Sequence, residues 1–312
     1  MRKLIQSISL LAIAFPITGY SDPAKVQPAP KIAVDQCAVK AVVAEPGIRQ
    51  FQFDGLSPDG SQMVVGWDRG DQDRGAYILD LASGERTPLP PLNNVGSFAP
   101  DGKTIVASVY LEEGKNDIIE YDLASGQVTP IAPHPNWEWS ASYSSDGQSI
   151  LFNSYREGTA DIYSYSKKSA KLKRWTSDPG YEAHAQFSPD DTKILYNAAD
   201  EDQVFNLFLI DTASGAITQL TDYPTEESYG SWHPSGNTIV FGSDRGHGGG
   251  KTDLFLMNSD GSNIRQLTNH PKKDAYPFFS PDGKTLYFNS DREPEGVYKI
   301  EFDENLQCVT QG

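Results

Sequence analysis

A five-residue turn motif recurs six times along the 312-residue chain at nearly constant spacing. The copies are LSPDG (56–60), FAPDG (98–102), YSSDG (143–147), FSPDD (187–191), WHPSG (232–236) and FSPDG (279–283). The fourth position of the motif recurs after steps of 42, 45, 44, 45 and 47 residues. Self-similarity at this period, without a helical pattern between copies, is typical of a β-propeller with one blade per repeat. We therefore expect an all-β fold, a six-bladed β-propeller of four-stranded blades.

Each repeat predicts four short strands joined by tight turns. In the Pro-Asp-Gly turn, Pro fixes φ at the first central position, Asp bonds its own backbone and Gly accepts left-handed geometry. A β-branched or aromatic run follows, such as Thr238 to Phe241, and then a third strand, such as Asp253 to Met257. The fourth strand ends in a recurring pair of residues: Trp175-Thr176, Leu220-Thr221 and Leu267-Thr268.

These residues resemble the WD-like propeller repeat of the Pro-Asp-Gly type, best known from the C-terminal domain of the TolB family. The resemblance covers roughly residues 40–312. TolB proteins carry an α/β domain before the propeller, and we expect this chain to lack that domain because few residues precede its first blade. The resemblance implies an envelope setting and a protein partner that inserts toward the propeller channel.

The N-terminus has the pattern of a secretory signal. Arg2 and Lys3 precede an apolar stretch from Leu4 to Ile17, and small residues follow it. A retained membrane anchor is the alternative, but the stretch is shorter than the ~20 residues that a spanning helix needs. The sequence predicts a periplasmic or secreted protein that does not insert into the membrane after cleavage. We expect three segments: a signal peptide (1–21), a Pro/Ala-rich linker (22–36) and the propeller (37–312).

The chain is strongly acidic, with 26 Lys and Arg against 42 Asp and Glu and a formal net charge of -16. Removal of the two basic residues of the signal leaves 24 against 42, or -18. Such a surface repels nucleic acid and anionic lipid. We therefore expect the partner to be an envelope protein or peptide that is basic or neutral, and no nucleic acid.

The two cysteines, Cys37 and Cys308, stand at the two ends of the expected propeller. A closed ring joins its first and last segments, and each end offers a strand, at 38–43 and at 306–310. We predict a Cys37–Cys308 disulfide across this closure, which export makes reasonable. The alternative is two unpaired thiols that merely lie close together. The sequence does not fix which end supplies the outermost strand.

Acidic residues occupy the same position in repeats three to six, five residues before the aromatic residue that opens the turn motif. They are Glu138, Glu182, Glu227 and Asp274. In one interpretation the acid belongs to the repeat consensus and caps the start of the innermost strand by bonding backbone N–H groups. In the other, the four acids form a recessed anionic site at the channel mouth. That site would take a Lys or Arg of a partner, or a divalent cation such as Ca²⁺.

Aromatic residues and a histidine accompany these acids. Rigid rings bury area at low entropic cost and attract cations, although rings at this place also hold adjacent blades together. The candidate binding residues are Glu138, Trp139, Glu182, His184, Glu227, Tyr229, Asp274 and Tyr276.

The motifs of enzymes are weak in this sequence. His134, His184 and His270 could in principle converge on a metal, as the resemblance to lyase propellers suggests, but no HExxH spacing is present. A GxSxG nucleophile elbow is absent. Asp-Arg pairs at 68–69, 244–245 and 291–292, with Arg156 as a partial copy, indicate salt bridges that tie loops together.

The sequence therefore predicts a non-catalytic, TolB-like binding scaffold that recognises a protein or peptide through an acidic and aromatic loop face. No cofactor is expected apart from Ca²⁺ in the channel, under the second interpretation of the acids. The alternative is a metal-dependent polysaccharide lyase or hydrolase of the propeller type. A third class, a structural module docked on a larger complex, predicts that neutralising the four acids changes nothing.

Overall fold

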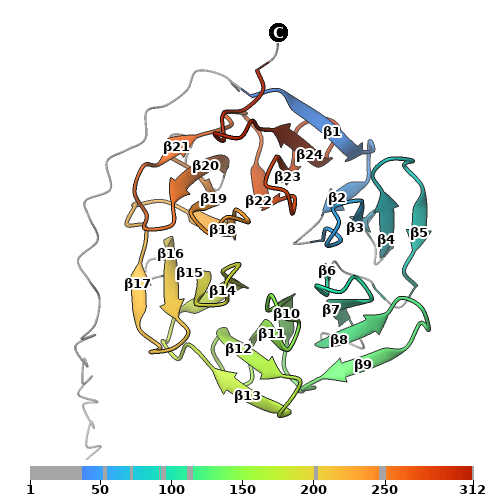
Figure 1. The fold of residues 1–312 in the computed structure, drawn as a ribbon, viewed down its shortest axis with the longest axis vertical. Helices are drawn as coiled ribbons and strands as arrows, with labels where there is room; N and C mark the ends of the chain where they lie inside the picture. The colour runs from blue at the N-terminus through green and yellow to red at the C-terminus, as the bar shows by residue number, and fades with distance from the viewer. Residues whose placement is uncertain are drawn as a thin grey trace, which may run out of the picture.

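A computed structural model describes residues 37–51, 55–70, 73–90, 92, 96–110, 115–199, 203–245 and 251–310. The expected signal peptide and linker lie outside these residues. The strands form six four-stranded sheets arranged in a ring (Figure 1). The prediction of an all-β, six-bladed propeller is confirmed. Within the same ranges, no helix has the length and apolar character needed to cross a membrane.

The blades follow one another along the chain, and each runs from the axis outward. Blades 1 and 2 contain β2 (Arg49–Phe51), β3 (Gln62–Asp68), β4 (Arg74–Asp80), β5 (Arg86–Pro88), β6 (Gly96–Phe98), β7 (Thr104–Tyr110), β8 (Asn116–Asp122) and β9 (Val128–Ile131). Blades 3 and 4 contain β10 (Glu138–Tyr143), β11 (Ser149–Ser154), β12 (Asp161–Ser166), β13 (Lys171–Arg174), β14 (Tyr181–Phe187), β15 (Lys193–Ala199), β16 (Phe205–Asp211) and β17 (Ile217–Gln219). Blade 5 contains β18 (Glu227–Trp232), β19 (Thr238–Ser243), β20 (Asp253–Asn258) and β21 (Arg265–Gln266).

Blade 6 closes the ring with strands from both ends of the chain. Its strands are β22 (Asp274–Phe279), β23 (Thr285–Ser290), β24 (Gly296–Glu301) and, outermost, β1 (Val39–Ala44). Strand β1 pairs antiparallel with β24, so the N-terminal segment supplies the outermost strand. The predicted disulfide between Cys37 and Cys308 is present, with the two Cα atoms 5.3 Å apart. The segment expected as a strand at 306–310 forms only an isolated bridge, between Phe302 and Cys308.

Polar side chains stabilise the turn that recurs in each blade. In blade 1 the hydroxyl of Ser57 donates to Asp59 at 2.6 Å, and the same Ser–Asp bond recurs in blades 3, 4 and 6. In blade 4, Asp191 takes the left-handed place of Gly, with φ 57°, and its carboxylate accepts a 2.6 Å bond from Ser145 of blade 3. The turn thus fixes the hairpin within each blade and, in blade 4, connects two blades.

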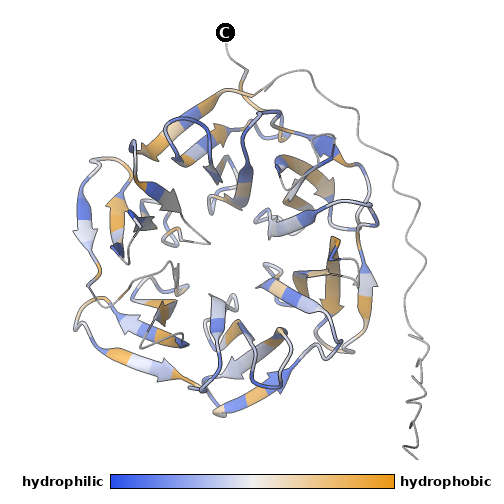
Figure 2. Ribbon diagram, turned by 180° about the vertical axis from the view of Figure 1, so that it is seen from behind, coloured by the Kyte–Doolittle hydropathy of each residue, from blue (hydrophilic) through white to orange (hydrophobic). Residues whose placement is uncertain are grey.

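Apolar residues of the strands form the core between the blades. Hydrophilic and apolar residues alternate along individual strands, as Figure 2 shows by hydropathy. Phe152, Phe241 and Phe288 occupy the same place in the second strands of blades 3, 5 and 6 and are fully buried. The core therefore repeats with the sequence and leaves the loops free to differ.

A bulge in the innermost strands determines where the candidate site residues lie. Strands β10, β14, β18 and β22 each shift register against the second strand of their blade. Within each bulge one non-glycine residue has a positive φ: Ser140 (54°), His184 (56°), Tyr229 (56°) and Tyr276 (52°). Bulges re-aim side chains, and a positive φ is uncommon for residues as large as Tyr and His. The four side chains are therefore held in place by the surrounding blades.

Candidate functional site

The four carboxylates lie at the starts of the innermost strands, as the repeat register predicts, but inside the blades. Their exposed fractions are 0% for Glu138, Glu227 and Asp274 and 2% for Glu182. Three of them form ion pairs within their own blade: Glu138 with Arg156, Glu227 with Arg245 and Asp274 with Arg292. Under the second interpretation these acids would form an exposed anionic site at the channel mouth. The structure instead buries them, where arginines of the same blade pair with three of them.

The ion pair of blade 6 shows the geometry of this arrangement. Nη2 of Arg292 lies 2.6 Å from Oδ2 of Asp274, and the hydroxyl of Ser290 donates to Oδ1 at 2.5 Å. Nε of Arg292 donates to Ser290 at 2.8 Å, and its guanidinium lies 5.4 Å from the ring centroid of Tyr298. A Ser two residues before the Arg recurs in blades 3 and 5. The arginines expected to tie loops together thus form their ion pairs with the buried acids of the innermost strands in blades 3, 5 and 6.

A threonine of the preceding blade also contacts the acid in three blades. The hydroxyl of Thr221, at the end of blade 4, bonds Glu227 of blade 5 and lowers its pKa, against the larger effect of burial. The same hydroxyl accepts a 2.9 Å bond from the backbone N–H of Leu207. Thr176 and Thr268 are equivalent to it. The recurrent Leu-Thr or Trp-Thr pair of the sequence thus connects each blade to the next through the buried acid.

Blade 4 departs from this pattern at Glu182. The register pairs Glu182 with Ala198, where the other blades place a Ser, and Asp200 stands at the position of the Arg. Burial raises the pKa of Glu182 to about 8, against a hydrogen bond from Thr176 that lowers it. Among the described residues, its Oε2 atom has no hydrogen-bond partner. Glu182 is therefore a buried carboxyl group that keeps its proton at pH 7.

We expect Glu182→Gln to make the stability of the protein less dependent on pH. The pKa of Glu182 rises from 4.5 to about 8 on folding. Between these values the unfolded chain releases a proton that the folded chain keeps, so the free energy of unfolding falls as pH rises. Gln removes this fall. Urea denaturation should show the variant more stable by about 1–3 kcal/mol at pH 8 and nearly equal to the native protein at pH 4. If the variant and the native protein differed in free energy of unfolding by the same amount at both pH values, the raised pKa of Glu182 would be contradicted.

The rings at the bulges of three blades lie together near the axis. The ring centroids of Tyr229 and Tyr276 are 4.0 Å apart, and His184 lies 4.9 Å from Tyr229 and 5.8 Å from Tyr276. Nδ1 of His184 is 3.4 Å from the hydroxyl of Ser140 in blade 3. Because blades 4 and 6 are not adjacent, a contact between their rings places this group at the channel. The structure thus brings together His184, Tyr229 and Tyr276, three of the candidate binding residues predicted from the sequence.

A second group of rings lies between blades 3 and 4. Trp139 is 5.1 Å from Tyr155 and 6.0 Å from Tyr181, which contacts Phe205 at 5.8 Å. Besides burial, an electrostatic interaction between the hydroxyls of Tyr276 and Tyr181 contributes to the raised pKa of Tyr181, so the two groups are neighbours. We call Trp139, Tyr155, Tyr181, His184, Tyr229 and Tyr276 the aromatic cluster. Its residues both pack blades together and remain partly exposed.

Charges of both signs surround the aromatic cluster. Nζ of Lys273 lies 5.0 Å from the ring centroid of Tyr229, and the charges of Glu226 and Arg49 act on the hydroxyl of Tyr229. Burial, with a smaller contribution from Lys273, lowers the pKa of His184 to about 4. The imidazole is therefore neutral at pH 7, and the channel mouth is aromatic with a mixed charged rim.

The other histidines considered for a metal site support their own loops. Nδ1 of His134 accepts a 3.2 Å bond from the backbone N–H of Asn136, and Nδ1 of His270 accepts one from Lys272 at the same distance. In the part of the chain that the structure describes, no three His, Cys, Asp or Glu side chains form a group able to hold a metal ion.

Six repeats, their four-stranded sheets and the axial aromatic cluster define a six-bladed propeller of the WD-like class. The TolB beta propeller domain family model matches residues 55–247. The chain belongs to this family. A comparison with curated proteins gives no match.

Solved structures of several proteins share the fold. TolB from Acinetobacter baumannii is 24% identical with a TM-score of 0.64, over 74% of this chain and 57% of that one. A protein assigned as TolB from Agrobacterium tumefaciens is 20% identical with a TM-score of 0.62, over 86% and 91%. An oligogalacturonate lyase in complex with manganese is 13% identical with a TM-score of 0.59, over 88% and 95%. This chain thus spans little more than half of the Acinetobacter protein, and these identities show the fold alone.

Proposed function

We propose that this protein is a periplasmic, non-catalytic scaffold that binds a protein or peptide partner at the channel mouth. The aromatic cluster is the observation that carries the proposal. It brings six rings from four blades to the face where the innermost strands begin. Trp137 adjoins it, because its backbone carbonyl accepts a 3.0 Å bond from the N–H of Tyr155, and its side chain is exposed to 44% and contacts Tyr110 of blade 2. Aromatic side chains dominate the energetics of protein interfaces because they bury much area with few rotatable bonds.

The chemistry of the mouth favours a neutral, apolar segment of the partner. The four acids that suggested a basic partner are buried in ion pairs and hydrogen bonds, so they offer no charge to it directly. Lys273, Arg49 and Glu226 leave charges of both signs at the rim. The disulfide between Cys37 and Cys308 suits an oxidising compartment and supports a periplasmic location.

We expect the double variant Trp137→Ser/Trp139→Ser to lose its partner in affinity capture and cross-linking from a cell-envelope fraction. Removal of two rings at an interface core costs about 2 kcal/mol or more each, which reduces occupancy strongly. The native protein should retain one stoichiometric partner under the same conditions.

Leu172→Ser is the matched control, because Leu172 on the outermost strand of blade 3 is exposed to 42%, close to the 44% of Trp137. It should capture the partner like the native protein. Thermal denaturation of all three proteins checks that folding is intact. Equal capture by the two-tryptophan variant and the native protein would rule out the channel mouth as the binding surface.

A further inference from the structure

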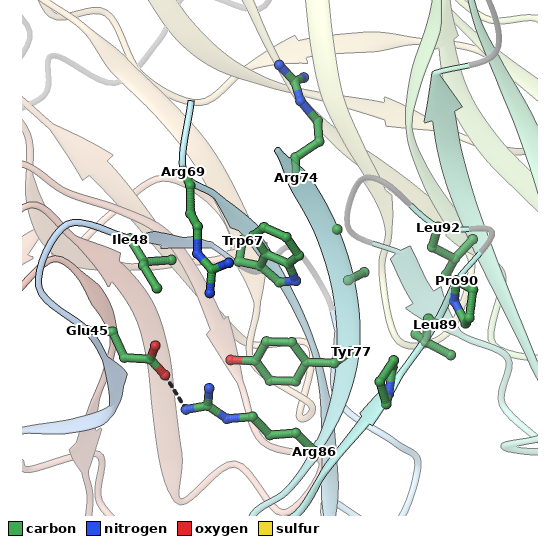
Figure 3. Close-up of a pocket in the computed structure, with 13 residues that line it drawn as sticks. Glu45, Ile48, Trp67, Arg69, Arg74, Tyr77, Arg86, Leu89, Pro90 and Leu92 are labelled. Carbon is green, nitrogen blue, oxygen red and sulfur yellow. Dashed lines mark ion pairs between the residues drawn. The ribbon is translucent and has the colours of Figure 1, made fainter. Parts of the chain in front are cut away.

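A cavity of about 500 Å³ lies over blade 1, away from the axis. Trp67 and Tyr77 form its centre, between the guanidinium groups of Arg69 and Arg86 (Figure 3). Apolar residues complete its wall: Ile48, Leu89, Pro90 and Leu92. We call this cavity the blade 1 pocket. Its size falls in the range of small-ligand sites, which are mostly apolar with a few polar groups that fix orientation.

Arg69 faces this pocket because blade 1 lacks the buried acid of blades 3 to 6. In blade 5 the register pairs Ser243 with Glu227, and Arg245 stands two residues after the Ser. In blade 1 the equivalent register pairs Trp67 with Gln50, and Arg69 stands two residues after the Trp. Where Arg245 has a side-chain exposure of 4%, that of Arg69 is 54%. The ion-pair partner of Arg69 is Asp73, four residues along the chain, at 3.6 Å and 56% exposed. The repeat therefore places an arginine here with an exposed, weakly held partner in place of the buried acid, because exposed pairs of this kind contribute little.

The aromatic rings orient the two guanidinium groups. Cζ of Arg69 lies 4.9 Å from the ring centroid of Trp67, and Cζ of Arg86 lies 5.1 Å from that of Tyr77. Contact with a ring face leaves the N–H groups at the edge of a guanidinium able to bind a carboxylate bidentately. Gly75 lies opposite Trp67, where a Cβ would be 2.9 Å from Cζ2 of the indole, so a larger residue would displace the ring.

The charge of the pocket is opposite to that of the whole chain. Among the described residues that line it, there are three arginines, Arg69, Arg74 and Arg86, and one carboxylate, Glu45, in a protein of net charge -16. Glu45 and Arg86 form an exposed ion pair at 2.5 Å, with side-chain exposures of 33% and 44%. Exposed pairs of this kind are worth about 0–1 kcal/mol, so a bound anion can share or replace this contact. The pocket therefore suits an anionic group joined to an apolar one.

The position of β5 favours a peptide as the bearer of that group. Strand β5 is the last of its sheet, so within the described part of the chain no further strand pairs with its outer edge. Arg86 and Pro88 belong to this strand and also line the pocket. An extended peptide can add to such an edge by main-chain hydrogen bonds.

We propose that the blade 1 pocket binds the C-terminal residue of a partner peptide, with its carboxylate on Arg86 and Arg69 and its apolar side chain against Trp67 and Leu89. This second site is independent of the channel mouth, and the proposal stands whether or not the mouth binds a partner.

Calorimetric titration with the peptide acetyl-Ala-Ala-Leu, as free acid and as C-terminal amide, tests the proposal. Hydrogen bonds to charged groups are worth about 1.5–3 kcal/mol, so amidation should weaken binding at least about tenfold. Arg86→Met should weaken binding of the free acid to a similar extent. Glu45→Gln should tighten it, because the competing carboxylate is removed.

Two controls make the result specific. Lys40→Met removes an exposed ion pair with Glu301 outside the pocket and should leave affinity unchanged. Trp137→Ser/Trp139→Ser, which alters the channel mouth, should also bind the peptide like the native protein. Equal binding of acid and amide, no binding of either at millimolar concentration, or unchanged affinity in Arg86→Met would each overturn the proposal. Equally tight binding of 3-phenylpropionate would assign the pocket to small acids and overturn the peptide as its ligand.

Discussion

Arg245→Met is expected to lower the free energy of unfolding by about 3–5 kcal/mol at pH 7, because it leaves the carboxylate of Glu227 buried without its partner. Glu227 is 0% exposed, and its remaining donors are the hydroxyls of Ser243 and Thr221. Met fills much of the volume of the arginine stem, so loss of the charge and its hydrogen bonds dominates. Urea denaturation at pH 7 measures the loss.

The double variant Glu227→Gln/Arg245→Met separates charge from packing. It removes both charges, and replacement of a whole buried pair by neutral groups is often nearly neutral. We expect it to recover most of the stability that Arg245→Met loses. The loss in the single variant should also be smaller at pH 5, where the buried carboxyl group is protonated more readily. If the single and double variants unfold at the same urea concentration, the ion pair is not what holds this part of blade 5.

The fold could be predicted because it depends on spacing alone. A turn motif at a regular interval sets the number of blades, and each copy places one strand before it and one strand after it. The disulfide followed from the same argument, since Cys37 and Cys308 bracket the ring. Which end supplies the outermost strand depends on the pairing of β1 with β24, a contact between distant segments that no local pattern encodes.

The position of the acids could be predicted, but not the direction of their side chains. The bulge after Glu227 shifts register between Ser228 and Ser231, so counting residues from the turn gives the strand position and not the facing side. One signal could have found the ion pairs. A Ser-x-Arg sequence occurs in blades 3, 5 and 6, the blades whose acid is paired, and it is missing in blade 4. Alignment of the repeats with one another would therefore have shown that the arginine accompanies the acid in blades 3, 5 and 6.

Blades 1 and 4 depart from the acid–arginine pairing of the repeat, and such departures are candidates for functional sites. Blades 3, 5 and 6 satisfy their buried acid with an arginine, whereas blade 4 leaves Glu182 without one. In blade 1, Arg69 has no buried acid and instead forms an exposed ion pair with Asp73 at 3.6 Å. A repeat that satisfies its own polar groups contributes stability only. Glu182 stays buried without its arginine, whereas Arg69 is 54% exposed and lines the blade 1 pocket together with Arg74 and Arg86 in an acidic protein.

Cys37→Ala/Cys308→Ala is expected to cost about 2–5 kcal/mol of stability, since the disulfide closes nearly the whole propeller. The two cysteines are 271 residues apart, and a cross-link over so long a loop restricts the unfolded chain strongly. Cys37 is 1% exposed and directly precedes β1, which pairs with β24 in blade 6. Urea denaturation should show the loss, and hydrogen exchange should show amides of β1 opening first.

Lys40→Met tests whether the effect belongs to the disulfide or to any contact between these two strands. Lys40 on β1 forms an exposed ion pair with Glu301 on β24 at 2.9 Å, which should contribute less than about 1 kcal/mol. The native protein treated with a reductant should resemble the double cysteine variant, and Lys40→Met should resemble the oxidised native protein. An unchanged denaturation midpoint in the double cysteine variant would mean that strand pairing alone closes the ring. In that case β1 exchange would remain slow, because the hydrogen bonds between β1 and β24 would suffice to hold blade 6 together.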